Sequence, residues 1–259
     1  MRHAPKQSKE ELLLAGDRQE AGRTSQGSRM RVITFASTKG GVGKSTLAAL
    51  CADGLLREGA RVQLIDLDPQ GTLTKWAEPI AQRSPALLTS RMAPIAGASF
   101  AQHYNALITI LEDETDWVII DTAGSDDVRQ LAALAICDLV ISPSGPVEAE
   151  VMGVQKTLRY LETALQEIGS TVPPMDMLRV VYQRPNGFPN AEMLVMRELI
   201  YDHFGAVDAI HQSAAIMSFL GRRMTTAEAI TAGSDAAPFL KMQAAADKLT
   251  QSLRGQFDV

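Results

Sequence analysis

The sequence has few of the residues that build metal centres, redox sites or membrane spans. Its two cysteines, Cys51 and Cys137, belong to no CxxC motif, and its four histidines show no spacing of metal ligands. We therefore expect both cysteines to be small buried side chains in a reducing compartment. No apolar run approaches the roughly 18 residues of a membrane helix, and the N-terminus lacks the apolar core of a signal peptide. These absences predict a cytoplasmic protein.

No large segment of the chain carries a strong excess of positive charge. The formal net charge is −5, which divides into +2 for residues 1–29, −7 for 30–176 and zero for 177–259. Any contact with nucleic acid must therefore come from a local cationic patch. Aromatic residues make up 5% of the 259 residues against 46% for all hydrophobic residues, which predicts an aliphatic core.

Short β-branched runs alternate with amphipathic stretches after residue 30. The expected strands are 32–35, 62–65, 117–120, 139–141 and 178–182, and the expected helices are 44–58, 98–112, 126–137, 147–168, 190–204 and 236–254. Buried apolar strands separated by helices are typical of a parallel sheet covered on both faces. The pattern predicts a doubly wound α/β fold with a mainly parallel sheet. Because residues 1–29 are polar and lack this pattern, we expect a flexible N-terminal arm before a single domain over 30–259.

A glycine-rich loop lies between the first expected strand and the first expected helix. It reads Lys39-Gly40-Gly41-Val42-Gly43-Lys44-Ser45-Thr46. Glycines allow a tight turn whose N–H groups point inward, and the helix that begins at Lys44 directs its positive dipole end to the same point. Lys44 can reach the β- and γ-phosphates of a nucleotide, Ser45 can bind Mg²⁺ and Thr46 can donate to the α-phosphate. The pattern predicts a phosphate-binding loop with ATP and Mg²⁺ as ligands.

The loop departs from the common Walker A pattern. That pattern requires glycine at position 38, where this chain has Thr38, and the deviant form instead places a lysine before the double glycine, as Lys39 does here. With the motifs that follow, the loop resembles that of the ParA/MinD group of P-loop ATPases, over roughly residues 30–255. In that group two subunits enclose two ATP molecules, and the signature lysine of each reaches the nucleotide of the other. The resemblance implies this in-trans role for Lys39, an in-cis role for Lys44 and a homodimer that forms on ATP binding.

Two aspartate motifs follow expected strands. Asp66 and Asp68 stand in the pattern D-x-D-P-Q, and Asp121 directly follows the apolar run 118–120. Ligands of open parallel sheets bind at the carboxyl ends of the strands, where these carboxylates are expected to lie. The resemblance implies that Asp66 and Asp121 hold water molecules of the Mg²⁺ shell. It also implies that Asp68 positions or activates the attacking water.

The chain departs from many relatives after the second aspartate motif. Those relatives continue with a proline, whereas this chain reads Gly124-Ser125-Asp126-Asp127. We expect Asp126 and Asp127 to cap and begin the next helix rather than to act in catalysis. The resemblance also places adenine recognition near Gln183 and Arg184, which follow the run 178–182.

Sequence features separate the branches of this group. The nitrogenase iron protein branch needs a cysteine soon after the second aspartate motif and the iron–sulfur scaffold branch needs a CxxC, and neither is present. The C-terminal residues 248–259 hold few cations, so stable membrane anchoring of the MinD kind is not expected. DNA partition or transfer remains. The expected contacts with DNA phosphates are Arg222, Arg223, Lys241 and Lys248.

The sequence therefore predicts a ParA-like ATPase that binds DNA non-specifically as an ATP-bound dimer and associates with the nucleoid in that state. The expected activator of its slow hydrolysis is a ParB-like centromere-binding protein, and the expected outcome is plasmid or chromosome partition or DNA transfer. Weaker similarities at 182–185 and 222–228 resemble the branch that serves conjugation and T-DNA transfer. Two alternatives stay open: a MinD-like positioning ATPase for a protein or membrane cargo, and a small-molecule kinase or ligase of the same fold.

Overall fold

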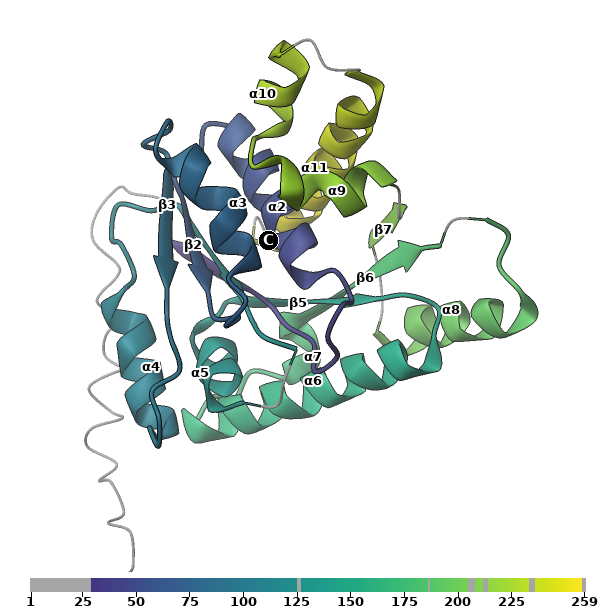
Figure 1. Ribbon diagram of the computed structural model, residues 1–259. Coiled ribbons are helices and arrows are strands. Elements are labelled where there is room, and N and C mark those ends of the chain that lie inside the picture. The colour runs from purple at the N-terminus through teal and green to yellow at the C-terminus, as the bar shows by residue number, and fades with distance from the viewer. Residues whose placement is uncertain are drawn as a thin grey trace, which may run out of the picture.

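A single parallel sheet organises the computed structural model, which describes residues 29–124, 127–185, 187–204, 208–211, 214–232 and 236–257. Within these ranges seven strands lie in the order β3-β2-β4-β1-β5-β6-β7 (Figure 1). The strands are β1 (Arg31–Phe35), β2 (Val62–Asp66), β3 (Leu87–Arg91), β4 (Trp117–Asp121), β5 (Leu139–Ser144), β6 (Leu178–Arg184) and β7 (Asp208–His211). The helices are α2 (Lys44–Arg57), α3 (Thr72–Ala81), α4 (Phe100–Thr109), α5 (Val128–Ile136), α6 (Glu148–Glu167), α7 (Pro174–Met177), α8 (Ala191–Phe204), α9 (Ala214–Arg222), α10 (Thr226–Thr231) and α11 (Ala236–Phe257).

The predicted α/β fold is confirmed, and every described strand pair is parallel. All five predicted strands and all six predicted helices are present, with small shifts at their ends. The pattern missed the two edge strands, β3 and β7. In β3 only Leu87 is buried, so the strand lacks the apolar run that marks the central strands. Except for Arg29, the predicted N-terminal arm lies outside the described residues.

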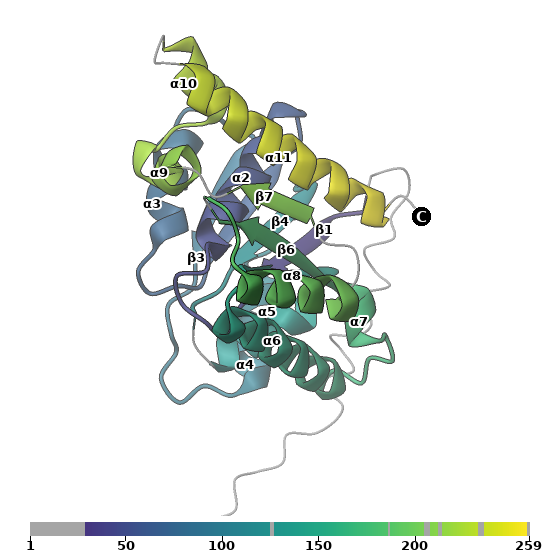
Figure 2. The same ribbon diagram turned by 90° about the vertical axis from the view of Figure 1, so that its right-hand side faces the viewer.

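Two helical layers cover the sheet (Figure 2). Helices α2, α3, α9, α10 and α11 pack on one face, and α4 to α8 pack on the other. Both layers are largely aliphatic, as predicted, with a few large aromatic side chains such as Trp76 and Phe219 fully buried. Cys51 and Cys137 are both buried thiols, and burial raises their pKa values. None of the described helices is long and apolar enough to cross a membrane.

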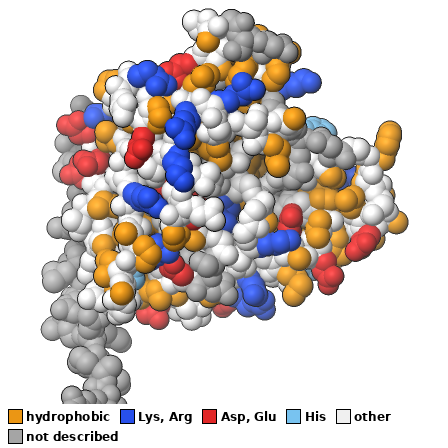
Figure 3. All heavy atoms as spheres, viewed as in Figure 1, with side chains coloured by type: hydrophobic (Ala, Val, Ile, Leu, Met, Phe, Trp, Pro, Cys, Tyr) orange, Lys and Arg blue, Asp and Glu red, His pale blue; other side chains and the backbone are white. Residues whose placement is uncertain are grey.

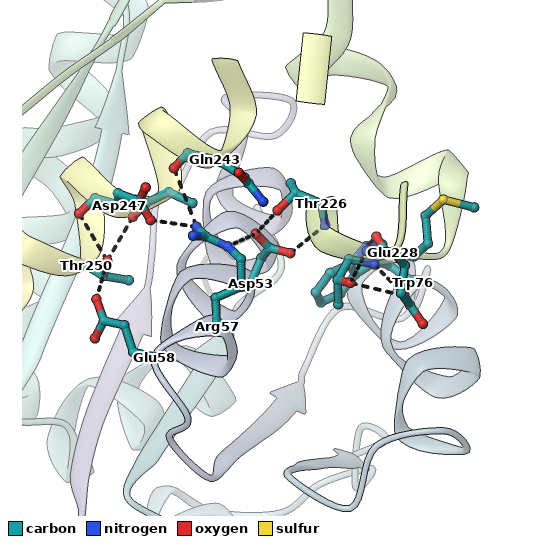
Figure 4. A network of polar contacts seen from close by, with 12 residues as sticks. Asp53, Arg57, Glu58, Trp76, Thr226, Glu228, Gln243, Asp247 and Thr250 are labelled. Atoms are coloured by element: carbon teal, nitrogen blue, oxygen red, sulfur yellow. Dashed lines mark hydrogen bonds and ion pairs between the residues drawn. The ribbon is translucent and has the colours of Figure 1, made fainter. Parts of the chain in front are cut away.

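A buried polar network fastens the C-terminal helices to α2 (Figure 4). Asp53 of α2 is fully buried and accepts hydrogen bonds from the backbone N–H of Thr226 at 2.8 Å and its hydroxyl at 2.7 Å. Arg57 donates to Asp53 at 3.1 Å and pairs with Asp247 of α11 at 2.7 Å. Helices α2 and α11 approach closely at Gly54, where a Cβ would lie 2.6 Å from the Thr250 methyl carbon.

A second contact joins α3 to the same C-terminal segment. The indole N–H of Trp76 donates to the carbonyl of Met224 at 3.2 Å, and its ring packs against Phe219 of α9 with centroids 5.4 Å apart. Arg83, just beyond α3, pairs with Glu228 of α10 at 2.9 Å. Helices α2 and α3 each begin directly after a loop at the carboxyl end of a central strand. The C-terminal segment is therefore anchored to the helices that follow the two loops of the candidate site.

Candidate functional site

The candidate site lies at the carboxyl ends of β1, β2 and β4, which are neighbours in the sheet. Phe35 is in register with Asp121, and Asp66 is in register with the same residue on the other side. The loops that leave these three strands therefore open at one edge of the sheet. This edge is where open parallel sheets bind their ligands.

The glycine-rich loop 38–43 has the shape of an anion cradle. Gly41 and Gly43 have φ values of 77° and 88°, in the left-handed region that favours glycine. Gly43 is the N-cap of α2 and offers no side chain to the first N–H groups of that helix. Open space lies where a Cβ of Gly40 or Gly41 would point. The first turn of α2 can thus present its N–H groups and its dipole to a phosphate.

Lys44 is buried at the start of α2 and directs its ammonium back along the loop. Its Nζ donates to the carbonyl of Lys39 at 3.3 Å, and the residue is 6% exposed. Burial lowers the pKa of Lys44, and the nearby carboxylates of Asp121 and Asp68 act in the opposite direction. A phosphate group beside this ammonium would supply the negative charge that a buried lysine requires.

Asp121 ends β4 with a buried carboxylate. Among the described residues neither of its carboxylate oxygens has a hydrogen-bond partner, and the residue is fully buried. Burial raises its pKa to about 7; the negative charges of Asp66 and Asp68 act in the same direction, while Ser45 and Lys44 oppose them. Unpartnered buried carboxylate oxygens beside a serine hydroxyl match the oxygen ligands that Mg²⁺ prefers.

Asp66 holds the first loop after β2 in place. One of its carboxylate oxygens accepts from the N–H of Asp68 at 2.9 Å, and the other accepts from the N–H and the hydroxyl of Thr74 at 2.9 and 3.0 Å. Asp68 is half-buried and accepts from the N–H of Gln70 at 2.8 Å. Sequence reasoning missed Thr74, which joins the loop to the start of α3.

The loop after β4 touches the phosphate loop at Gly124. A Cβ on Gly124 would lie 2.6 Å from the Cα of Gly40, so only glycine fits here without backbone movement. Asp127 is the N-cap of α5 and accepts from the N–H of Arg129 at 2.6 Å, as predicted, whereas Asp126 lies outside the described residues. The buried guanidinium of Arg129 also donates to the carbonyl of Leu67 at 3.0 Å and so connects the two aspartate loops.

Lys39 reaches out of the loop toward α6. Its Nζ lies 3.9 Å from a carboxylate oxygen of Glu150, and its side chain is 38% exposed. Glu150 lies in the first turn of α6, and its other oxygen accepts from the N–H of Gly145 at 2.5 Å. Sequence reasoning did not single out Glu150, because it is far from the lysine in the chain and belongs to no motif.

The two residues predicted to recognise adenine point to opposite sides of β6. Gln183 donates a short hydrogen bond to the carbonyl of Val42 and so lies against the phosphate loop. Arg184 instead lines a cavity of about 530 Å³ on the side of α8, together with Tyr182 and Tyr201. The structure therefore brings Gln183 to the loop but not Arg184, as the alternation of side chains along a strand requires.

The four predicted DNA-contacting cations are exposed on the C-terminal helices. Arg222 ends α9, where its guanidinium lies 4.7 Å from the centre of the Phe239 ring, and Arg223 follows it with a φ of 53°. Lys241 and Lys248 are exposed on α11. Figure 3 shows Lys and Arg side chains spread over the face on which α3 and α10 lie. These positions are compatible with contacts to phosphates.

Similarity to known proteins agrees with this geometry. Residues 33–231 match the family described as the CobQ/CobB/MinD/ParA nucleotide binding domain. The chain is 26% identical over 212 residues to the protein virC1 of Rhizobium radiobacter, which covers 80% of this chain and 87% of that protein. It is 33% identical over 172 residues to the chromosome-partitioning ATPase Soj of Thermus thermophilus, which covers 56% of this chain and 66% of Soj.

Several other curated relatives are matched over only about half to two thirds of their own length. Among solved structures, the Aquifex aeolicus MinC:MinD cell division protein complex is similar with a TM-score of 0.60 and 19% identity, over 87% of this chain and 96% of that chain. That likeness supports the fold. The match over residues 33–231 spans the phosphate loop, both aspartate motifs and the C-terminal cations Arg222 and Arg223. The chain is therefore a member of the CobQ/CobB/MinD/ParA nucleotide-binding family and a ParA/MinD-type ATPase.

Proposed function

We propose that this ATPase is a DNA-partition or DNA-transfer ATPase that acts as an ATP-bound homodimer. The observation that carries the proposal lies at the edge of the phosphate loop. There the buried ammonium of Lys44 donates to a main-chain carbonyl, and among the described residues the buried carboxylate oxygens of Asp121 have no hydrogen-bond partner. A nucleotide phosphate with its cation would bind at both groups. The cradle of Gly40, Gly41, Val42 and Gly43 fits the same group.

The residues of the site divide the work of binding. Lys44 and the N–H groups of α2 hold the phosphates, Thr46 donates to the α-phosphate, and Gln183 marks the adenine side. Ser45 would bind the cation, and Asp66 and Asp121 would hold water molecules of its shell. When bound, Mg²⁺ neutralises phosphate charge that develops during phosphoryl transfer.

Asp68 is the proposed residue for positioning the attacking water. It lies on a loop that Asp66, Thr74 and Arg129 hold in place, and its half-buried carboxylate is near enough to Lys44 of the phosphate loop to act on the pKa of that lysine. Fixing a carboxylate in this way favours a single water orientation. Replacing Asp68 with alanine should abolish hydrolysis and leave ATP-dependent dimers intact.

The proposed homodimer places Lys39 of each subunit at the nucleotide of the other. Its side chain leaves the phosphate loop of its own subunit, where Lys44 already fills the inner position. A cation supplied by the second subunit makes dimer formation depend on the phosphates of the nucleotide. Size-exclusion chromatography with ATP tests this role, and unchanged dimerisation of Lys39→Ala would refute it.

We propose that the ATP-bound dimer binds DNA. The side chains that would contact the DNA are Arg222, Arg223, Lys241 and Lys248. Soj, with which this chain shares 33% identity, is a chromosome-partitioning ATPase. Cations contacting phosphates bind DNA without reading its sequence, so the ATP-bound dimer would associate with the nucleoid in the cytoplasm. A ParB-like centromere-binding protein is the proposed activator of hydrolysis.

ATP-dependent DNA binding tests the proposal most directly. Purified protein is sedimented with DNA in the presence of Mg²⁺ and either ATP or no nucleotide, alongside Lys44→Ala. We expect DNA binding to require ATP and to be lost in the variant. A positioning ATPase for another cargo would bind ATP in calorimetry but would not sediment together with DNA. Absence of nucleotide binding in calorimetry would refute the site itself.

A further inference from the structure

We propose that Glu150 is a positioning residue for Lys39. Glu150 holds the ammonium of Lys39 within the same subunit until the nucleotide of the partner subunit replaces Glu150 as its ionic partner. The inference rests on the in-trans role of Lys39 proposed above. The ammonium of Lys39 pairs with the carboxylate of Glu150 in the monomer and with the phosphates of the partner's nucleotide in the dimer. The two anions therefore compete for it. Dimerisation therefore requires this ion pair to open.

The position of Glu150 is built by the backbone around it. The N–H of Gly145 donates to one carboxylate oxygen at 2.5 Å, which turns the other oxygen toward the Lys39 ammonium at 3.9 Å. A Cβ on Gly145 would lie 2.7 Å from the bonded oxygen, so the glycine makes room for this contact. The carboxylate is thus fixed before Lys39 reaches it.

Helix α6 lies directly against the phosphate loop. Gly153, one turn after Glu150, faces the loop so closely that a Cβ there would lie 3.4 Å from the Ser37 hydroxyl and 3.6 Å from the Cβ of Lys39. These distances are those of ordinary van der Waals contact. The first turn of α6 is therefore packed against the loop, within reach of Lys39.

The two lysines of the loop are held in different ways. Lys44 is buried and donates to the main-chain carbonyl of Lys39, which fixes the backbone there. The ammonium of Lys39, at the other end of that residue, forms its ion pair among the described residues with Glu150. The pair is partly exposed on both sides, at 38% for Lys39 and 22% for Glu150. It can therefore open at low cost.

The strength of such a pair sets the size of the effect. Partly exposed ion pairs stabilise by an amount that corresponds to at most about fivefold in an equilibrium constant. The dimer opens two of them, one in each subunit. Removing the charge of Glu150 should therefore tighten the ATP-dependent dimer by about two- to twenty-fivefold.

Glu150→Gln is the informative variant, and Glu148→Gln is its matched control. The glutamine keeps an oxygen for the Gly145 N–H and loses only the negative charge. Glu148 is exposed in the same first turn of α6, so its replacement removes an equal charge from the same helix end without touching Lys39. Dimer dissociation constants are measured by analytical ultracentrifugation with Mg²⁺ and a non-hydrolysable ATP analogue. Calorimetry on each variant checks that the nucleotide site is folded.

We expect a tighter dimer for Glu150→Gln and no change for Glu148→Gln. The difference should shrink as salt is raised, because the pair is partly exposed. An unchanged or weaker dimer for Glu150→Gln overturns the inference and leaves the proposed function standing, provided that Lys39→Ala still prevents dimerisation. If the unmodified protein forms no dimer with the analogue, or if Lys39→Ala forms it equally well, both proposals fail.

Discussion

We expect the replacement of Asp53 by alanine to lower the stability of the fold strongly. It is fully buried on α2 and accepts three hydrogen bonds, two from Thr226 and one from Arg57. The Asp53→Ala variant leaves the backbone N–H and the hydroxyl of Thr226 without their acceptor, whereas Arg57 keeps its ion pair with Asp247. These groups join α2 to the start of α10, which lies 173 residues away in the chain.

The expected loss of stability follows from the groups left unsatisfied. Arg57 is partly exposed and keeps Asp247 as its partner, so its charge is not left without compensation. Each buried donor of Thr226 that loses its acceptor costs about 1–3 kcal/mol, and the two contributions overlap in one site. We therefore expect a decrease of about 2–5 kcal/mol in the free energy of unfolding, which is a large part of the roughly 5–15 kcal/mol typical of a domain.

Glu58→Ala provides the control for this prediction. Glu58 is the C-cap of α2 and pairs with Arg254 of α11 at 2.5 Å. Unlike Asp53, it is not buried: the side chains of Glu58 and Arg254 are 37% and 40% exposed. Its replacement should cost about 0–1 kcal/mol. Urea denaturation followed by circular dichroism measures both variants. A loss below about 1 kcal/mol for Asp53→Ala, or equal losses for the two variants, would show that the network does not fasten the C-terminal helices.

Three further predictions follow from single contacts. Gly124→Ala should weaken ATP binding by about one to two orders of magnitude, because the new Cβ would displace the backbone of Gly40, 2.6 Å away; calorimetry showing unchanged affinity would contradict the close approach. Arg222→Gln should lower the slope of log affinity for DNA against log salt by about one, as measured by fluorescence anisotropy, and an unchanged slope would remove this residue from the DNA surface. The hydrogen bond from Arg83 lowers the pKa of Glu228, so its stabilisation is complete above the ordinary value of 4.5 and is lost as the pH falls below it. Thermal unfolding of Glu228→Gln and the unmodified protein should therefore differ most above about pH 5 and converge toward about pH 3, and a difference independent of pH would contradict this assignment.

The motifs of the site could be predicted because each is local. A phosphate loop needs its glycines, lysines and hydroxyls within eight consecutive residues, and each aspartate motif needs an apolar strand directly before it. The order of these segments along the chain also predicted the parallel sheet. The edge strands β3 and β7 could not be predicted in this way, because a short strand at the edge of a sheet has little buried surface to mark it.

The contacts that hold the site together could not be predicted. Glu150 lies far from Lys39 in sequence, Arg129 joins two loops that come from different strands, and Thr74 bonds back across the first aspartate loop. No spacing rule connects these residues. Likewise, Gln183 and Arg184 were both predicted near the adenine, but neighbouring residues of a strand point to opposite sides, and which of them faces the phosphate loop depends on how the strand is set in the sheet.

The sequence by itself determined the class of fold, the phosphate loop and the positions of its lysines and aspartates, because these depend on neighbouring residues and on the period of a strand or helix. Only the tertiary structure decided which groups pair with these lysines and aspartates through ion pairs and hydrogen bonds. Burial and hydrogen bonding depend on what lies opposite a residue in space. Lys39 therefore pairs with Glu150, Asp53 accepts from Thr226, and within the part of the chain that the structure describes the buried oxygens of Asp121 have no hydrogen-bond partner.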